Sequence, residues 1–142
     1  MAAIRTRRVI LGTLAGGVVW IIWSSAISFL VLMPRYADAQ KAGWLLVEPR
    51  YRLFVLYWFV TLFLLTYILT WVYVSARTTL GPGPLTAVRV GLLMGFVMSF
   101  PLSLSMATWA TFSRYIVLGW MLDLWVGSIL ATVVSAWLFK ES

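Results

Sequence analysis

Long apolar runs alternate with short polar connections along the whole chain. Four of these runs are long enough to cross a bilayer as helices, since a span needs about 20 residues; they comprise residues 9–33, 53–75, 88–111 and 117–139. None of the runs shows the alternation of hydrophobic and polar positions that is typical of a barrel strand. The pattern therefore predicts an all-α membrane protein, a bundle of four transmembrane helices that forms a single domain over residues 1–142.

The polar connections contain residues that end helices. Pro34 directly follows the first run and is expected to close it, and no helix should continue through Gly81-Pro82-Gly83-Pro84. The stretch around Arg7-Arg8 loosely resembles a twin-arginine export motif. The apolar run behind it has about 25 residues, however, whereas a signal peptide has roughly 7 to 15. We therefore expect a first helix that is retained.

The basic residues at the ends of the runs predict the orientation in the membrane. With the N-terminus inside, the inner side holds Arg5, Arg7, Arg8, Arg77, Arg89 and Lys140, and the outer side holds Arg35, Lys41, Arg50, Arg52 and Arg114. Six against five is a small excess, and the three arginines ahead of the first run decide it. We expect an integral, multi-pass membrane protein with both termini in the cytoplasm.

Small residues recur at four-residue spacing in the first, third and fourth runs, which places them on one face of each helix. In lipid, small side chains let two helix backbones approach closely, and this close approach is what holds transmembrane helices together. The residues predicted to pack in this way are Gly12, Gly16, Gly91, Gly95, Ser99, Ser103, Gly127, Ala131 and Ser135. Pro101 interrupts the third run and is expected to bend that helix.

The second run differs from the others, because residues 53–74 contain no Gly, Ala or Ser and many aromatic residues. A helix of this kind cannot pack along a close seam, so we expect it at the periphery of the bundle. Lipid contact, with aromatic anchors at the two interfaces, is the plain interpretation. Contact with a partner subunit, a quinone or a pigment is the alternative. The residues expected to make it are Phe59, Phe63, Tyr67 and Trp71.

A shift of 79 residues aligns the first run with the third. It places Val9, Gly12, Gly16 and Ser24 on Val88, Gly91, Gly95 and Ser103, and Arg35-Tyr36 on Arg114-Tyr115. The fold would then consist of two repeated helical hairpins related by an axis along the membrane normal. Chance matching between apolar segments explains the same alignment equally well.

The composition narrows the chemistry further. The chain of 142 residues is 63% hydrophobic and 11% charged, and it has neither cysteine nor histidine. This removes thiol nucleophiles and the usual ligands of haem and zinc. Paired acids inside the runs and a glycine-rich phosphate loop are missing as well. We therefore predict that the protein is not an enzyme and has no intrinsic cofactor or metal. Its net charge of +7 suits anionic lipid headgroups and not nucleic acid.

Asp123 is the only acidic residue in an apolar run, and it is the only charged one away from the ends of the runs, since Arg89 stands at the beginning of the third run. A charge in hydrocarbon is costly unless it is paired or neutralised. Asp123 lies about two turns into the run 117–139, within reach of an arginine on the outer side, so we expect a polar clasp in which Arg114 or Arg35 pairs with it. Two other interpretations are a protonated Asp123 bonded to serines or threonines, and a proton or cation site for transport.

Together these patterns favour a non-catalytic accessory or structural subunit of a larger integral membrane complex, for example a photosynthetic or respiratory one. Its partners would be other membrane subunits, anionic lipids or further copies of itself, and lipid, quinone or pigment would contact the second helix. The alternative is a small oligomeric transporter, or a carrier of hydrophobic ligands, that uses Asp123.

Overall fold

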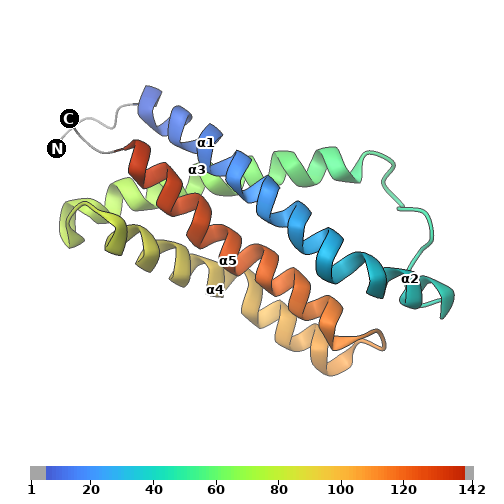
Figure 1. Cartoon of the computed structure of the whole chain (residues 1–142). Coiled ribbons are helices and arrows are strands. Elements are labelled where there is room, and N and C mark those ends of the chain that lie inside the picture. The colour runs from blue at the N-terminus through green and yellow to red at the C-terminus, as the bar shows by residue number, and fades with distance from the viewer. Residues whose placement is uncertain (1–5, 140–142) are drawn as a thin grey trace.

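A computed structural model describes residues 6–139 of the chain; Arg5 and Lys140, which entered the charge count above, lie outside this range. Within it, four helices are long and apolar enough to cross a membrane. They run side by side, and the beginning of the first and the end of the last lie at the same end of the molecule (Figure 1). This confirms the predicted all-α bundle of four transmembrane helices.

The first span is longer than expected, because Pro34 does not end it. Helix α1 (Thr6–Ile27) continues through a π-helical turn, η1 (Ser28–Leu32), into α2 (Met33–Lys41). In the wider turn the backbone N–H of Met33 bonds to the carbonyl of Ser28, five residues back. Pro34 then lies in the first turn of α2, where a missing N–H is tolerated. The predicted end at residue 33 was wrong for this reason.

The other helices begin and end close to the predicted positions: α3 at Phe54–Leu80, α4 at Pro84–Trp109 and α5 at Arg114–Leu138. Between α3 and α4, Gly81 and Gly83 have φ angles of 85° and 127°, which are strained for any residue with a side chain. The N–H of Gly83 donates to the hydroxyl of Tyr73 at 3.2 Å, so this turn is fastened to the body of α3.

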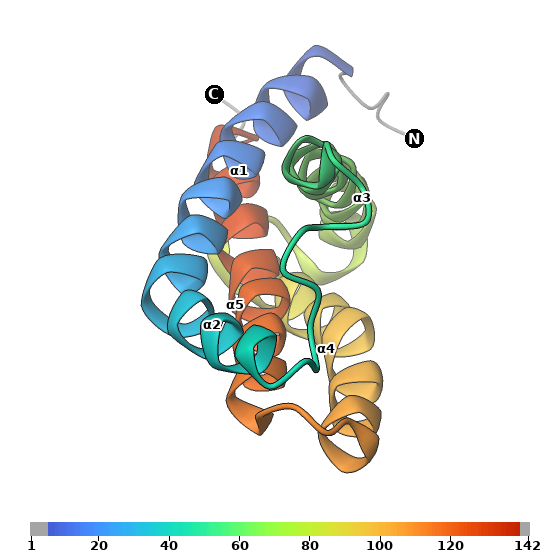
Figure 2. The same cartoon turned by 90° about the vertical axis from the view of Figure 1, so that its right-hand side faces the viewer.

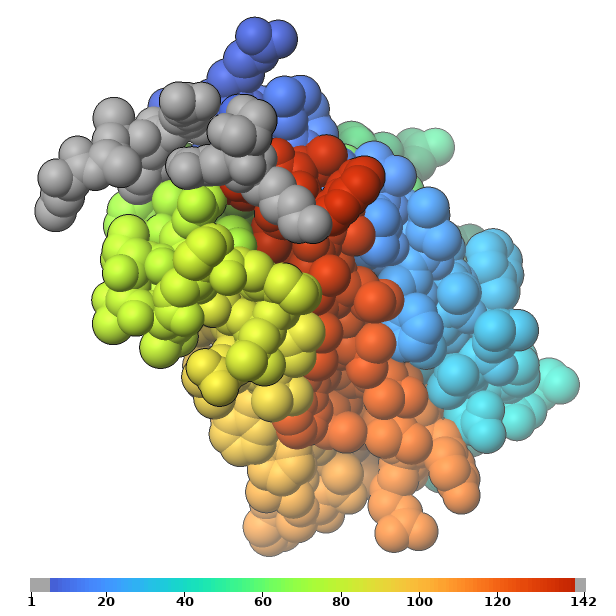
Figure 3. Space-filling model, turned by 60° about the vertical axis from the view of Figure 1, so that its left-hand side comes forward, coloured from blue at the N-terminus to red at the C-terminus, as the bar shows by residue number. Residues whose placement is uncertain are grey.

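Helix α5 occupies the centre of the bundle, with α1 on one side and α4 on the other (Figure 3). Helix α3 lies beside α1 at the edge, and the connection that leads to it crosses one end of the bundle (Figure 2). Its inner face buries Leu62, Thr66, Leu69, Thr70, Tyr73 and Val74. The helix is peripheral as expected, but Thr66 and Thr70, four residues apart, give it a narrow contact face.

Glycines bring the backbones of α1 and α4 against α5. A Cβ atom added at Gly16 would lie 2.6 Å from the carbonyl oxygen of Ala131, and one added at Gly91 would lie 2.6 Å from the Cα of Ile129. The glycine carbonyls are within reach of hydroxyls on α5: Ser135 donates to Gly12 at 2.7 Å and Ser128 donates to Gly91 at 2.8 Å. Close approach and interhelical hydrogen bonds therefore occur at the same places.

Gly12 and Gly91 are equivalent in the 79-residue alignment, and both accept from a serine of α5. The two hairpins nevertheless pack differently, since α5, the second helix of its hairpin, is central and its counterpart α3 lies at the edge. The internal repeat stays a prediction.

Candidate functional site

The carboxyl group of Asp123 is the centre of a buried polar network. Its residue is 3% exposed, and Oδ2 accepts a hydrogen bond from Ser24 Oγ at 2.7 Å. The same Ser24 oxygen accepts from Trp58 Nε1 at 3.0 Å. Because the three residues belong to α5, α1 and α3, one short chain of hydrogen bonds connects three helices in the apolar interior.

Two further tryptophans hold the backbone beside Asp123. The indole N–H of Trp20 donates to the carbonyl of Asp123, and that of Trp23 donates to the carbonyl of Leu122, each at 3.0 Å. Trp20 is completely buried, and its ring fills the space beside Gly127. The sequence offered one signal for this contact: Trp20 stands between Gly16 and Ser24 in the register of small residues on the first helix.

The arginines predicted to pair with Asp123 are elsewhere. The guanidinium of Arg35 lies 4.8 Å above the ring of Tyr115 and donates to the carbonyl of Val31 at 3.1 Å. Arg114 lines a groove described below. Within residues 6–139 neither forms an ion pair with Asp123, so the predicted clasp is wrong in its partners. Since α5 begins at Arg114, Asp123 is nine residues into the helix, about 13 Å from that end and beyond an arginine's reach.

One oxygen of the carboxyl group, Oδ1 of Asp123, has no hydrogen-bond partner although it is buried. The contact that the other oxygen makes is with a hydroxyl group. Of the three interpretations of Asp123, this contact fits the one in which a protonated Asp123 bonds to serines or threonines. The network joins three helices, and none of its residues lines either of the two hollows described next.

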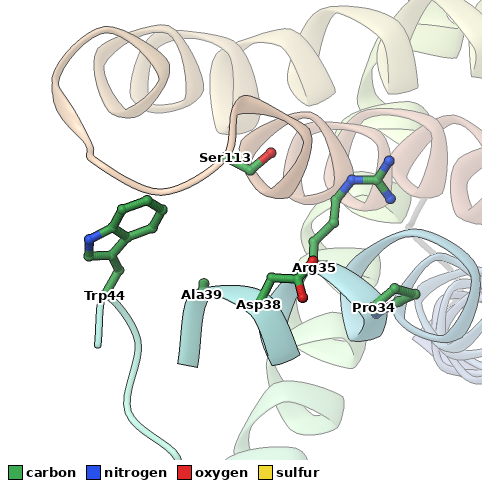
Figure 4. Close-up of a pocket in the computed structure, with 6 residues that line it drawn as sticks. All are labelled: Pro34, Arg35, Asp38, Ala39, Trp44 and Ser113. Atoms are coloured by element: carbon green, nitrogen blue, oxygen red, sulfur yellow. The ribbon is translucent and has the colours of Figure 1, made fainter. Parts of the chain in front are cut away.

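Two hollows lie at the end of the bundle where α4 turns into α5. The first, of about 430 Å³, is lined by Pro34, Arg35, Asp38, Ala39, Trp44 and Ser113 (Figure 4). The second, of about 350 Å³, is a groove between α4 and α5. It is lined by Phe100, Ser103, Leu104, Ala107, Arg114, Tyr115, Val117, Leu118 and Met121. Asp123 lines neither of them.

Ser99 and Ser103, both predicted to pack, differ in their surroundings. Ser99 is buried, and its hydroxyl donates to the carbonyl of Gly95 in its own helix at 2.6 Å. Ser103 comes after Pro101, is half-buried and lines the groove. The close seam between α4 and α5 thus extends from Gly91 to Ser99 and opens beyond the proline.

The four residues of α3 expected to face a partner, pigment or lipid are also divided. Phe63 is not on the outer face: its ring lies against Gly17 of α1, where a glycine leaves room for it, so this prediction was wrong. Phe59 is half-buried. Tyr67 and Trp71 are 45% and 50% exposed. They lie on the outer face of α3, Tyr67 at its middle and Trp71 one turn further towards its C-terminal end.

Among the residues that the structure describes, no three His, Cys, Asp or Glu side chains are placed to hold a metal ion. Comparison of the chain with protein-family models, curated proteins and solved structures finds no match.

Proposed function

We propose that this protein is a non-catalytic subunit of a larger integral membrane complex and that it docks through the outer face of α3. The observation that carries the proposal is the position of Tyr67. It is the central residue of the 27-residue helix Phe54–Leu80, about 20 Å from either end, and its side chain points outward.

A hydroxyl group at this depth needs a partner. Other hydroxyl groups on α3 find acceptors one turn back in their own helix: Thr66 and Thr70 donate to the carbonyls of Leu62 and Thr66, each at 2.7 Å. The hydroxyl of Tyr67 has no hydrogen-bond partner within residues 6–139. Lipid tails offer none, and leaving a polar group unpaired in hydrocarbon costs several kcal/mol. A neighbouring subunit with a polar group opposite Tyr67 removes this cost.

The rest of the molecule supports a structural role. The hydrogen bonds from Trp58 to Ser24 and from Ser24 to Asp123 join α1, α3 and α5, and neither hollow reaches Asp123. A transporter that uses Asp123 needs a path to that carboxyl group, so the subunit role is the better supported of the two functions.

The proposal is tested by placing a photoreactive benzoylphenylalanine at position 67 and, as a control, at position 93, since Leu93 lies on the exposed side of α4. After irradiation of native membranes, we expect position 67 to crosslink to one defined membrane protein that also co-purifies in mild detergent. Position 93 should yield lipid adducts only. Tyr67→Phe should weaken the co-purification.

Three outcomes contradict the proposal: lipid adducts alone at both positions, a crosslink only to a second copy of the chain, or a chain of 16.1 kDa that purifies by itself. An absorption band in the purified protein together with a small-molecule adduct at position 67 assigns the same surface to a pigment or quinone instead.

A further inference from the structure

The groove between α4 and α5 is charged at one end and apolar at the other, as a lipid molecule is. One of its ends carries Arg114, the first residue of α5, where that helix reaches the end of its apolar span. The other end, around Phe100 and Met121, is apolar and lies inside the span. Both walls, Phe100 to Ala107 and Arg114 to Met121, extend over eight residues, about 10 Å parallel to the helix axes.

The groove is a permanent feature of the packing. Pro101 lies inside α4 and has no N–H to offer the carbonyl of Val97, and beyond it Ser103 and Ala107 no longer meet α5 closely. The inner end is closed by rings: Phe100 stacks on Phe96 with centroids 4.9 Å apart and meets Trp125 edge-on at 6.3 Å. Trp125 is itself fixed by a 3.1 Å hydrogen bond to the carbonyl of Leu92.

The charge at the mouth of the groove is unopposed. The exposed guanidinium of Arg114 has no ion pair or hydrogen bond within the described part of the chain, and no acidic residue lines the groove. The first hollow is different, because Asp38 shares it with Arg35. Two of the first N–H groups of α5 are already bonded to Ser113, since Tyr115 N–H donates to its hydroxyl at 3.2 Å and Ile116 N–H donates to its carbonyl at 3.1 Å.

From the charge at one end, the apolar lining at the other and their spacing along the helices, we infer that this groove binds one anionic glycerophospholipid. The guanidinium of Arg114 pairs with the phosphate, and one acyl chain lies in the groove along Ser103, Ala107 and Val117. All four residues line the groove. Its volume of about 350 Å³ is near the lower limit for binding pockets, roughly 300 Å³, and accommodates a single chain. A partner helix is disfavoured, because Leu104 and Leu118 stand out at the rim where close helix packing needs small residues.

The test is native mass spectrometry of the full chain in mild detergent, titrated with phosphatidylglycerol or phosphatidylcholine. We expect one tightly retained phosphatidylglycerol, held about fivefold more strongly than phosphatidylcholine, since a basic residue near an anionic headgroup contributes a factor of about this size. Arg114→Gln should abolish this preference. Arg52→Gln, which removes an exposed arginine from the connection before α3, is the matched control and should retain it.

The proposed position of the acyl chain in the groove is tested separately. Ser103→Phe fills the groove and should reduce retention of both lipids at least fivefold, whereas Val97→Phe, on the exposed side of the same helix, should leave it unchanged. Helix content by circular dichroism shows that each variant is folded. Equal binding of the two lipids to the unaltered chain, or full retention in Ser103→Phe, overturns the assignment. So does a dimer in place of the lipid adduct, since it assigns the groove to a second copy.

Discussion

The hydroxyl of Ser24 takes part in two hydrogen bonds inside the bundle, one donated to Asp123 and one accepted from Trp58. Both are made away from water, where no solvent molecule takes over when a partner is removed. The stability of the contact between α1, α3 and α5 should therefore be sensitive to this small residue, although it contributes little apolar area.

Ser24→Ala removes both bonds and leaves the Asp123 carboxyl oxygen and the Trp58 indole N–H without partners. We expect the free energy of unfolding to fall by about 1 to 2 kcal/mol, since single interhelical hydrogen bonds in membranes contribute about 0.6 kcal/mol and at most about 1.7. Reversible unfolding in bicelles measures this change. Ser75→Ala is the control, because the Ser75 hydroxyl bonds only within its own helix, to Trp71. Equal losses in the two variants would show that the network is not coupled between helices.

The sequence identified Asp123 as the unusual residue of the interior but not its partners. Burial follows from the apolar residues around it and from its register with Gly119 and Gly127, which can be read along one helix. The partners Ser24, Trp20 and Trp58 come from two other helices, and their approach depends on how those helices are rotated and offset. Spacing within a single chain contains no measure of that rotation, so it indicates only Arg114, the nearest arginine along the chain, and Arg35, its counterpart in the repeat.

At the scale of helices, the glycines of the packing faces differ in how closely the neighbouring backbone approaches. A Cβ atom at Gly91 would lie 2.6 Å from the Cα of Ile129, and backbone cannot move aside without displacing a whole helix. At Gly12 the nearest atom, the Ser135 carbonyl oxygen, lies 3.3 Å away, a distance that a shift of a few tenths of an ångström relieves.

Gly91→Ala should therefore destabilise the bundle by about 1 to 3 kcal/mol, the usual cost of inserting a methyl group into a close-packed contact. Gly12→Ala should cost less than half of that, because the contact can adjust. The midpoints of thermal unfolding in one detergent give the order of the two variants. If Gly12→Ala were the more destabilising, the distances between α1, α4 and α5 described above would not be what limits their approach.

The small-residue pattern predicted which faces of the first, third and fourth helices carry glycine. Gly16 and Gly91 do lie at close backbone approaches, whereas Gly127 leaves room for the ring of Trp20. The pattern missed the contact face of α3, since threonine is not counted among the small residues, and yet Thr66 meets Gly16 and Thr70 is buried one turn further on. It also placed Ser103 in the seam, because spacing alone cannot show that Pro101 lets the two helices separate.

At the scale of the whole molecule, the open question is which way the bundle is inserted. An even number of spans brings both ends of the described chain to one side. The excess of arginine before the first helix leads us to expect that this side is cytoplasmic.

The absence of cysteine makes this orientation simple to test. V47C lies in the exposed connection before α3 and T79C in the exposed last turn of α3, at opposite ends of the bundle. A membrane-impermeant maleimide added to intact cells should label V47C and not T79C, and both should react after lysis. The reverse pattern would place the termini outside.

The π-helical turn at residues 28–32 has a consequence for the tolerance of this chain to changes in length. Because this turn takes up one additional residue, it sets the following helix back by about 100° relative to a regular helix of the same length. That rotation directs Tyr36 towards Trp120, with which it forms a hydrogen bond, and lays Arg35 over Tyr115. Because the turn holds one residue more than a regular turn, loss of a single residue between Ser28 and Leu32 would restore a regular helix with Tyr36 and Arg35 still directed towards α5. An additional residue, or a return of the turn to a regular α-helix at its present length, would turn both side chains away while leaving every amino acid in α2 intact. The direction in which α2 presents its side chains therefore depends on the number of residues in the π-helical turn as well as on their identity.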